Sequence, residues 1–306
     1  MSVHAEVERV NPASGASNVH WDPRISGRRA VGRIWRGLFF GSTAMAIVLL
    51  GMLLWSIMQP GWGWLSWHLI TEMPSRNAED AGFNSAIWGS VWIVIGSAIF
   101  SFFVGVGTAI YLEEYAPRNR YTRFLQTNIS NLAGVPSVVY GLLGLVFFVQ
   151  WLNLGRSISA GALTMGLLIL PVVVISSQEA IRAVPLGLRQ GAYALGATKW
   201  QTVRSHVLPT AMPGILTGMI LSMSRAIGET APLIVVGASS LVLTNPGGPL
   251  SSFTAMPVQI FNWSARPQQE FEHLAAAAIL VLLTVLLSMN ALAIFLRQRL
   301  SNKNRM

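Results

Sequence analysis

Six long runs of apolar, almost uncharged residues most constrain what this chain can fold into. The runs cover half of the 306 residues and contain only two charged side chains, Arg225 and Glu229. They span residues 38–58, 86–112, 124–152, 157–178, 213–243 and 274–296. Each run reaches the roughly 20 residues that a helix needs to cross the ~30 Å hydrocarbon core of a bilayer. The sequence therefore predicts an all-α integral membrane protein with six transmembrane helices.

The distribution of Lys and Arg predicts the orientation of these helices. Outside the runs, 17 of the 20 basic residues lie in the two termini and in the second and fourth loops. Because basic residues are enriched on the cytoplasmic side, both termini are expected in the cytoplasm. The net charge of +9 is then a topology signal, and no folded basic domain remains to bind nucleic acid.

The predicted organisation follows from these two patterns. It comprises a disordered cytoplasmic tail at 1–37, a first transmembrane helix at 38–58, an external loop at 59–85, a five-helix core at 86–296 with a cytoplasmic loop at 179–212, and a cytoplasmic tail at 297–306. The first run is longer than the roughly 7 to 15 apolar residues of a signal peptide, and no small-residue cleavage site follows it. We therefore expect the first helix to be a retained anchor.

Motifs for catalysis and metal binding are missing from the sequence. The chain has no cysteine, its five histidines show no metal-ligand spacing, and neither HExxH nor GxSxG occurs. Neither of its two lysines, Lys199 and Lys303, follows a glycine, so there is no GxxxxGK[ST] phosphate-binding loop. The sequence predicts a chain that is not an enzyme and holds no metal or cofactor of its own.

The two charges inside the fifth run form a candidate substrate-pathway site. An ionised side chain in the membrane costs at least a few kcal/mol, so it normally faces a partner or a water-filled path. Arg225 and Glu229 are four residues apart and share one helical face. The run is too long for one straight crossing, and Gly228 and Pro232 are natural points for a break. Since the planar guanidinium of Arg binds oxyanions, we expect Arg225 to help an anion through, with Glu229 orienting it or forming a gate. The alternative is an ion pair that only locks helices together.

The fourth loop, residues 179–212, is long for a connection between neighbouring spans. Its apolar residues recur at helical spacing, and the glycines at 191 and 196 interrupt the pattern. We expect two short helices with a tight turn, closed by Pro209 and Pro213. The loop is either an amphipathic segment on the inner leaflet or a docking element for a cytoplasmic partner.

Segments of this loop resemble the EAA loop of ABC-importer permeases. Residues 190–196 read QGAYALG, and Leu208-Pro209 follows at the spacing of that motif. The chain departs from the motif where Gln190 replaces its Glu, Gly191 its first Ala and His206 its Ile. The resemblance implies coupling to an ATPase through this segment. The implied coupling residues are Gln190, Gly191, Ala192, Gly196, Leu208 and Pro209.

Three further segments resemble the PstA permeases of type I phosphate importers, which have a MetI-like transmembrane domain. They read NLAGVPSVVYGL at 131–142, RAIGETAPL at 225–233 and MPVQIFNW at 256–263. The sister permease family, PstC, shares the first two, and the stretch before the last run favours PstA. The resemblance implies a role for Arg225 and Glu229 in phosphate passage. In the same region the polar side chains of Asn131, Ser137 and Tyr140 are candidates for contact with an anion, or for helix packing.

The resemblance also implies partners and a location. The chain is expected in the plasma (inner) membrane of a prokaryote, in contact with lipid. Its implied partners are a homologous PstC-like permease, two copies of a PstB-like ATPase that bind ATP, and an external PstS-like phosphate-binding protein. Two alternatives stay open: a permease for another oxyanion such as sulfate or molybdate, and an ion-coupled secondary anion transporter. An intramembrane enzyme is disfavoured because no nucleophile and base are paired.

Overall fold

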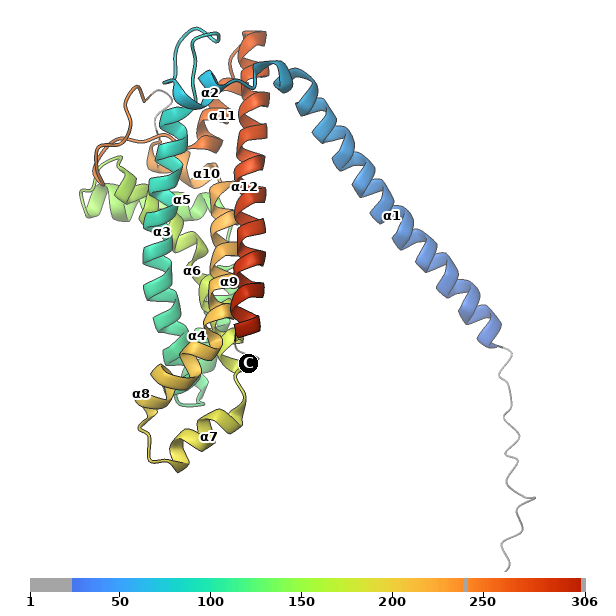
Figure 1. Ribbon diagram of the computed structural model, residues 1–306, viewed down its shortest axis with the longest axis vertical. Coiled ribbons are helices and arrows are strands. Elements are labelled where there is room, and N and C mark those ends of the chain that lie inside the picture. The colour runs from blue at the N-terminus through green and yellow to red at the C-terminus, as the bar shows by residue number, and fades with distance from the viewer. Residues whose placement is uncertain (1–23, 239–241, 304–306) are drawn as a thin grey trace, which may run out of the picture. The chain divides into compact units, whose positions relative to one another are not determined.

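The computed structural model describes residues 24–238 and 242–303, which form helices joined by turns and loops (Figure 1). This part of the chain contains no β-strand, which confirms the all-α class. Contacts divide the chain into two units, 1–55 and 56–306. The helix packing that positions the candidate sites belongs to the second unit.

Helix α1 (Arg24–Gly61) contains the first apolar run. The predicted disordered tail, 1–37, is wrong for residues 24–37, because these are already helical; residues 1–23 lie outside the described chain. The segment 24–37 holds no proline, and its Arg, Ala and apolar residues favour helix, so the helix extends backwards from the run. The predicted external loop at 59–85 holds two short helices, η1 (Trp62–Trp64) and α2 (Trp67–Thr71), the second capped by Ser66.

Four long helices make up the body of the second unit (Figure 1). They are α3 (Asn84–Ile110), α6 (Ile158–Arg182), α9 (Leu208–Ile227) and α12 (Gln269–Lys303), and each contains all or part of one predicted run. Helix α6 packs against α3 and α9, and α12 packs against α9. Helix α12 continues through most of the predicted C-terminal tail at 297–306, so residues 297–303 are helical.

The third run does not form the single straight helix that its length suggests. It is divided into α4 (Arg120–Leu132) and α5 (Ser137–Gly144), and the latter continues as the π-helical η3 (Leu145–Trp151). The two parts are bent by 103°. Gly134 and Pro136 lie at the bend, where proline disfavours helical geometry for the residue before it. Among the described residues, five helices are long and apolar enough to cross a membrane, or six if this bent pair is one span.

The fifth run is broken where the sequence predicts. Helix α9 ends at Ile227, and α10 (Ala231–Val236) begins after three intervening residues. Helix α10 packs against α5, so the two interrupted runs meet. Their contact is close, because a Cβ added to Gly141 would lie 2.8 Å from the Cα of Pro232. Helix α11 (Met256–Ser264) follows and packs against α12 and α3.

The predicted pair of short helices in the fourth loop is confirmed as α7 (Leu186–Ala194) and α8 (Lys199–Thr202). The turn between them contains Gly196 with φ +81°, a conformation that favours glycine. Gly191 lies inside α7, so the predicted interruption there is wrong. The prolines do not close the loop either: α8 continues through the π-helical η4 (Val203–Val207) into α9, where Pro209 occupies the first turn. A proline is tolerated in a first turn because the missing N–H has no helical partner there.

Small residues allow α6 and α9 to approach closely. Gly214 and Gly218 lie one turn apart on α9 and face Ala180 and Ser176 of α6. A Cβ on Gly218 would overlap the side chain of Ser176. This is the packing by which membrane helices associate, since the lipid is as apolar as their side chains.

Substituting Gly218→Val is therefore expected to separate α6 from α9. We expect a loss of stability of about 2 kcal/mol, in the range of overpacked cores, measured as a lower thermal unfolding midpoint in detergent. The matched control is Gly107→Val on α3, where an added Cβ meets no atom within 4 Å. Equal midpoints for the two variants would contradict the packing role of Gly218.

Candidate functional site

Arg225 and Glu229 flank the break between α9 and α10. Arg225 lies in the last turn of α9, and its carbonyl accepts a hydrogen bond from the N–H of Gly228. The Nε atom of Arg225 lies 3.7 Å from Oε1 of Glu229, too far for a hydrogen bond but within ion-pair range. The Arg225 side chain is 60% exposed on the surface of this chain, whereas that of Glu229 is 22% exposed. The guanidinium is thus available to a group outside the chain.

A small cavity joins Arg225 to the bend of the third run. It is lined by residues of the α4–α5 bend, α6 and α9: Leu132, Ala133, Val135, Ser137, Tyr140, Leu168, Ile169, Val172, Ser222 and Arg225. The structure thus brings three of the predicted pathway residues, Ser137, Tyr140 and Arg225, to one cavity. Neither Asn131 nor Glu229 lines it.

The volume of this cavity limits the size of a molecule that it can hold in the present conformation. Its volume is about 20 Å³, enough for about one water molecule and too small for phosphate. The hydroxyl of Tyr140 donates a 2.8 Å hydrogen bond to the carbonyl of Leu132 and so stabilises the α4–α5 bend. This cavity has room for phosphate only if the helices that line it, among them α5 and α9, move apart.

The predicted coupling residues lie at the opposite end of α9 from the break. Gln190 and Gly191 are exposed on α7, Ala192 is 4% exposed and packs inward, and Gly196 forms the turn. Leu208 and Pro209 begin α9. The loop also exposes large apolar side chains, those of Leu186, Leu188, Tyr193, Leu195 and Trp200. An exposed apolar patch on a polar loop is typical of a protein–protein contact.

A buried ion pair attaches this loop to the end of α3. The π-helical η2 (Tyr111–Tyr115) extends α3, and its Glu114 accepts hydrogen bonds from Nε and Nη2 of Arg189 at 3.1 and 3.0 Å. The two side chains are only 8% and 13% exposed. Arg189 also donates to the carbonyls of Ile181 and Val184 at 2.8 and 2.7 Å. One guanidinium therefore holds α7, η2 and the end of α6 together.

A second ion pair lies beside the first. Nε and Nη2 of Arg182 donate to the two carboxylate oxygens of Glu113 at 2.9 and 2.7 Å, and Gln178 donates to the same carboxylate. Glu113 and Glu114 are not among the residues that the sequence motifs predict, and the Lys and Arg distribution marks Arg182 and Arg189 only as topology signals. The signal that could have identified these two acids is their position: they are adjacent and directly follow an apolar run, in a chain with only 12 acidic residues.

Comparison with known proteins places this architecture in a family. Residues 102–302 match the family described as binding-protein-dependent transport system inner membrane component. In the bacterial alginate ABC transporter, in complex with a pentasaccharide-bound periplasmic protein, a chain aligns with a TM-score of 0.66 at 14% identity over 90% of this chain and 98% of its own length. A chain of the inward-facing MetNI methionine ABC transporter aligns with a TM-score of 0.57 at 14% identity, covering 70% and 94%. These likenesses show a shared fold.

The chain therefore belongs to the family of inner membrane components of binding-protein-dependent transport systems, and it is a multi-pass membrane protein. Several of the proteins it is similar to are phosphate transport system permease proteins. PstA 1 of Mycobacterium tuberculosis is 34% identical over 97% of this chain and 95% of its own length. PstA of Yersinia pestis is 33% identical over 82% and 86%, and PstA of Haemophilus influenzae is 33% identical over 86% and 93%. The resemblance to PstA permeases that the sequence motifs indicate is confirmed.

The turn at Gly196 gives a test of the loop geometry. Because its φ is +81°, Gly196→Ala is expected to destabilise the loop by about 1 kcal/mol. Gly191→Ala is the matched control: it lies inside α7 with no atom near an added Cβ, and is expected to be neutral or to stabilise by about 0.5 kcal/mol. Hydrogen exchange of the amides of α7 and α8 measures the difference. If both variants exchange alike, the turn does not depend on glycine.

The buried ion pair gives a second test. Arg189→Gln leaves Glu114 buried without its partner and removes two carbonyl contacts, so we expect a loss of about 3 kcal/mol of stability. Thermal unfolding in detergent measures it. Arg204→Gln removes the same charge from an exposed position of η4 and should shift the midpoint little. A similar midpoint for Arg189→Gln and Arg204→Gln would show that the buried pair does not hold the loop.

Proposed function

We propose that this chain is the transmembrane permease subunit of an ATP-driven importer of inorganic phosphate, and that it forms half of the translocation pathway. The observation that carries the proposal is the position of Arg225. This residue lies in an apolar run of a membrane protein, yet its side chain is 60% exposed on the surface of the single chain. An arginine that faces lipid inside the hydrocarbon region costs several kcal/mol of free energy. We therefore expect the surface around it to face a protein partner or water.

The exposed surface around Arg225 is proposed to face a second permease. A second, homologous permease covers the face that carries Arg225, and the anion passes between the two chains. The guanidinium suits this role because its planar fork bonds two oxygens of an oxyanion at once. Glu229 lies 3.7 Å from it and limits how long the anion stays bound, since it competes for the same cation. Ser137 and Tyr140 lie at the same cavity and come into reach when α5 and α9 separate.

The comparison with relatives favours phosphate as the substrate of this chain. Several of them are phosphate transport permeases and match over most of their own length. The chemistry of Arg225 alone specifies only an oxyanion, so sulfate or molybdate is the second candidate. Family membership disfavours the ion-coupled secondary transporter, because transport in this family depends on a binding protein. An external phosphate-binding protein is accordingly proposed to deliver the anion to the face opposite α7 and α8.

The energy source is proposed to be a separate ATPase. This chain has no phosphate-binding loop in its sequence, and it presents the exposed apolar side chains of α7 and the turn to a partner. Two ATPase copies are expected, one beneath each permease, on the cytoplasmic side where the Lys and Arg distribution places α7 and α8. Gln190, Gly191 and Ala192 lie in α7 within the contact region, and Leu208 and Pro209 carry its movement into α9.

Substituting Arg225→Ala tests the pathway role. In proteoliposomes containing the permease pair, the ATPase and the binding protein, we expect phosphate uptake to fall at least about tenfold, because one charge-assisted contact contributes more than about 1.4 kcal/mol. Co-purification of the ATPase should be unchanged. The matched control is Arg76→Ala, an exposed basic residue outside the apolar runs. Normal uptake by an assembled Arg225→Ala complex would reject the role, and uptake that persists without ATP would reject the importer itself.

A further inference from the structure

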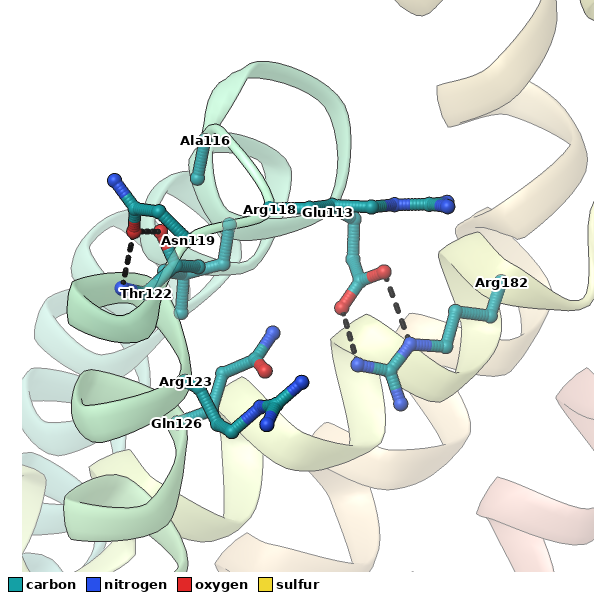
Figure 2. A pocket seen from close by; sticks show the side chains of 9 residues that line it. Glu113, Ala116, Arg118, Asn119, Thr122, Arg123, Gln126 and Arg182 are labelled. Atoms are coloured by element: carbon teal, nitrogen blue, oxygen red, sulfur yellow. Dashed lines mark hydrogen bonds and ion pairs between the residues drawn. The ribbon is translucent and has the colours of Figure 1, made fainter.

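A second, larger cavity lies away from Arg225, where η2, the start of α4 and the end of α6 meet (Figure 2). Its volume is about 320 Å³, within the range of ligand pockets, against about 20 Å³ at Arg225. Its lining is mostly polar: Leu112, Glu113, Ala116, Arg118, Asn119, Thr122, Arg123, Gln126 and Arg182. No residue lines both cavities.

The cavity carries an excess of positive charge. Three guanidinium groups line it, those of Arg118, Arg123 and Arg182, against the single carboxylate of Glu113. Arg182 is paired with Glu113 and, at 3.0 Å, with Glu179. Within the described residues, neither Arg118 nor Arg123 forms an ion pair. Two unmatched arginines in one polar cavity favour a ligand with negative charge.

The walls of the cavity are held in place without a ligand. Asn119 caps α4 by accepting a 2.9 Å hydrogen bond from the N–H of Thr122, and the Thr122 hydroxyl donates to the carbonyl of Pro117 at 2.7 Å. This fixes the turn that carries Arg118 and the first turn of α4 that carries Arg123. On the other wall, the two hydrogen bonds between Arg182 and Glu113 fix the end of α6 against η2 (Figure 2). The arginines are therefore presented from rigid elements, which lowers the entropy lost on binding.

We propose that this cavity is a binding site for a phosphate-bearing anion, separate from the translocation pathway. Guanidinium groups bind phosphate oxygens in bidentate geometry, and the amide groups of Asn119 and Gln126 in the lining supply further donors. Two sources share this chemistry: free inorganic phosphate, and the phosphate of an anionic phospholipid headgroup. The proposed orientation puts the cavity at the cytoplasmic leaflet, where basic pockets of membrane proteins bind anionic headgroups.

Occupancy of this cavity would act on the coupling loop. A bound phosphate group competes with Glu113 for Arg182, and Glu113 is adjacent in the chain to Glu114, which holds Arg189 of α7. Weakening the Arg182–Glu113 ion pair would let the backbone of η2 shift, and so would weaken the neighbouring Arg189–Glu114 ion pair. The site is therefore placed to make the docking of α7 depend on the lipid or on phosphate in the cytoplasm.

Binding by the complete purified chain tests the proposal, and the readout does not depend on transport. In nanodiscs of phosphatidylcholine containing a small fraction of phosphatidylglycerol, native mass spectrometry measures the lipid that stays bound. Equilibrium dialysis with radiolabelled inorganic phosphate measures the free anion. Phosphate binding is measured in the Arg225→Ala background, so that a pathway site makes no contribution.

The test variant is the double substitution Arg118→Gln and Arg123→Gln, and its matched control is Arg120→Gln with Arg204→Gln. The control removes the same charge from two exposed arginines that do not line the cavity. We expect the test variant to lose at least about tenfold in affinity for one of the two ligands, and the control less than about twofold. Thermal unfolding midpoints verify that both variants are folded.

The outcome also identifies the ligand. Selective loss of phosphatidylglycerol retention assigns the site to a lipid headgroup, and selective loss of phosphate binding assigns it to the free anion. The proposal is overturned if the unsubstituted cavity binds neither ligand, or if test and control variants lose binding equally. A negative result at this cavity would not contradict the proposed pathway at Arg225, because the two cavities share no residue.

Discussion

A charge inside a membrane must be matched, and this constraint decides how the chain is organised. The apolar runs contain only two charged residues, and one of them, Arg225, is exposed on the surface of the single chain. Neither lipid nor the 3.7 Å contact to Glu229 satisfies that guanidinium well. This unmatched charge is the basis for our proposal that a second subunit covers the surface and that an anion or water meets the guanidinium there.

The remaining structure connects this surface to the loop of α7 and α8, which we propose as the contact with the ATPase. Helix α9 carries Arg225 near one end, and its other end continues through η4 into α8. Glycines keep α9 close to α6, and Gly141 keeps the interrupted helices α5 and α10 in contact. The Glu114–Arg189 ion pair joins α7 to α3. Packed elements therefore link α7 and α8 to both the break and the bend, and we propose that coupling movements follow this link.

Much of this arrangement is predictable from the sequence, because apolar run length and glycine or proline placement are local signals. The break beside Gly228 and the turn at Gly196 follow from such signals. The place of the bend between α4 and α5 also has such a signal in Gly134 and Pro136, but its angle of 103° depends on contacts with α6 and α10 that the sequence does not reveal. The pairing of Glu114 with Arg189 joins residues 75 apart, and no spacing rule reveals it. The sequence makes Tyr140 a candidate anion contact, yet its hydroxyl donates a hydrogen bond to the carbonyl of Leu132.

Accessibility of the Arg225 surface tests the central claim most directly, and the absence of cysteine from the chain makes the measurement simple. Leu221 is 56% exposed and lies one turn before Arg225 on the same face of α9, whereas Leu49 is an exposed residue of α1. In the assembled transporter during ATP turnover, Leu221→Cys should react with a membrane-impermeant anionic thiol reagent, phosphate should slow the reaction, and Leu49→Cys should stay unreactive. If Leu221→Cys is as inert as Leu49→Cys, the surface around Arg225 faces lipid or a dry interface, and the pathway proposed here is wrong.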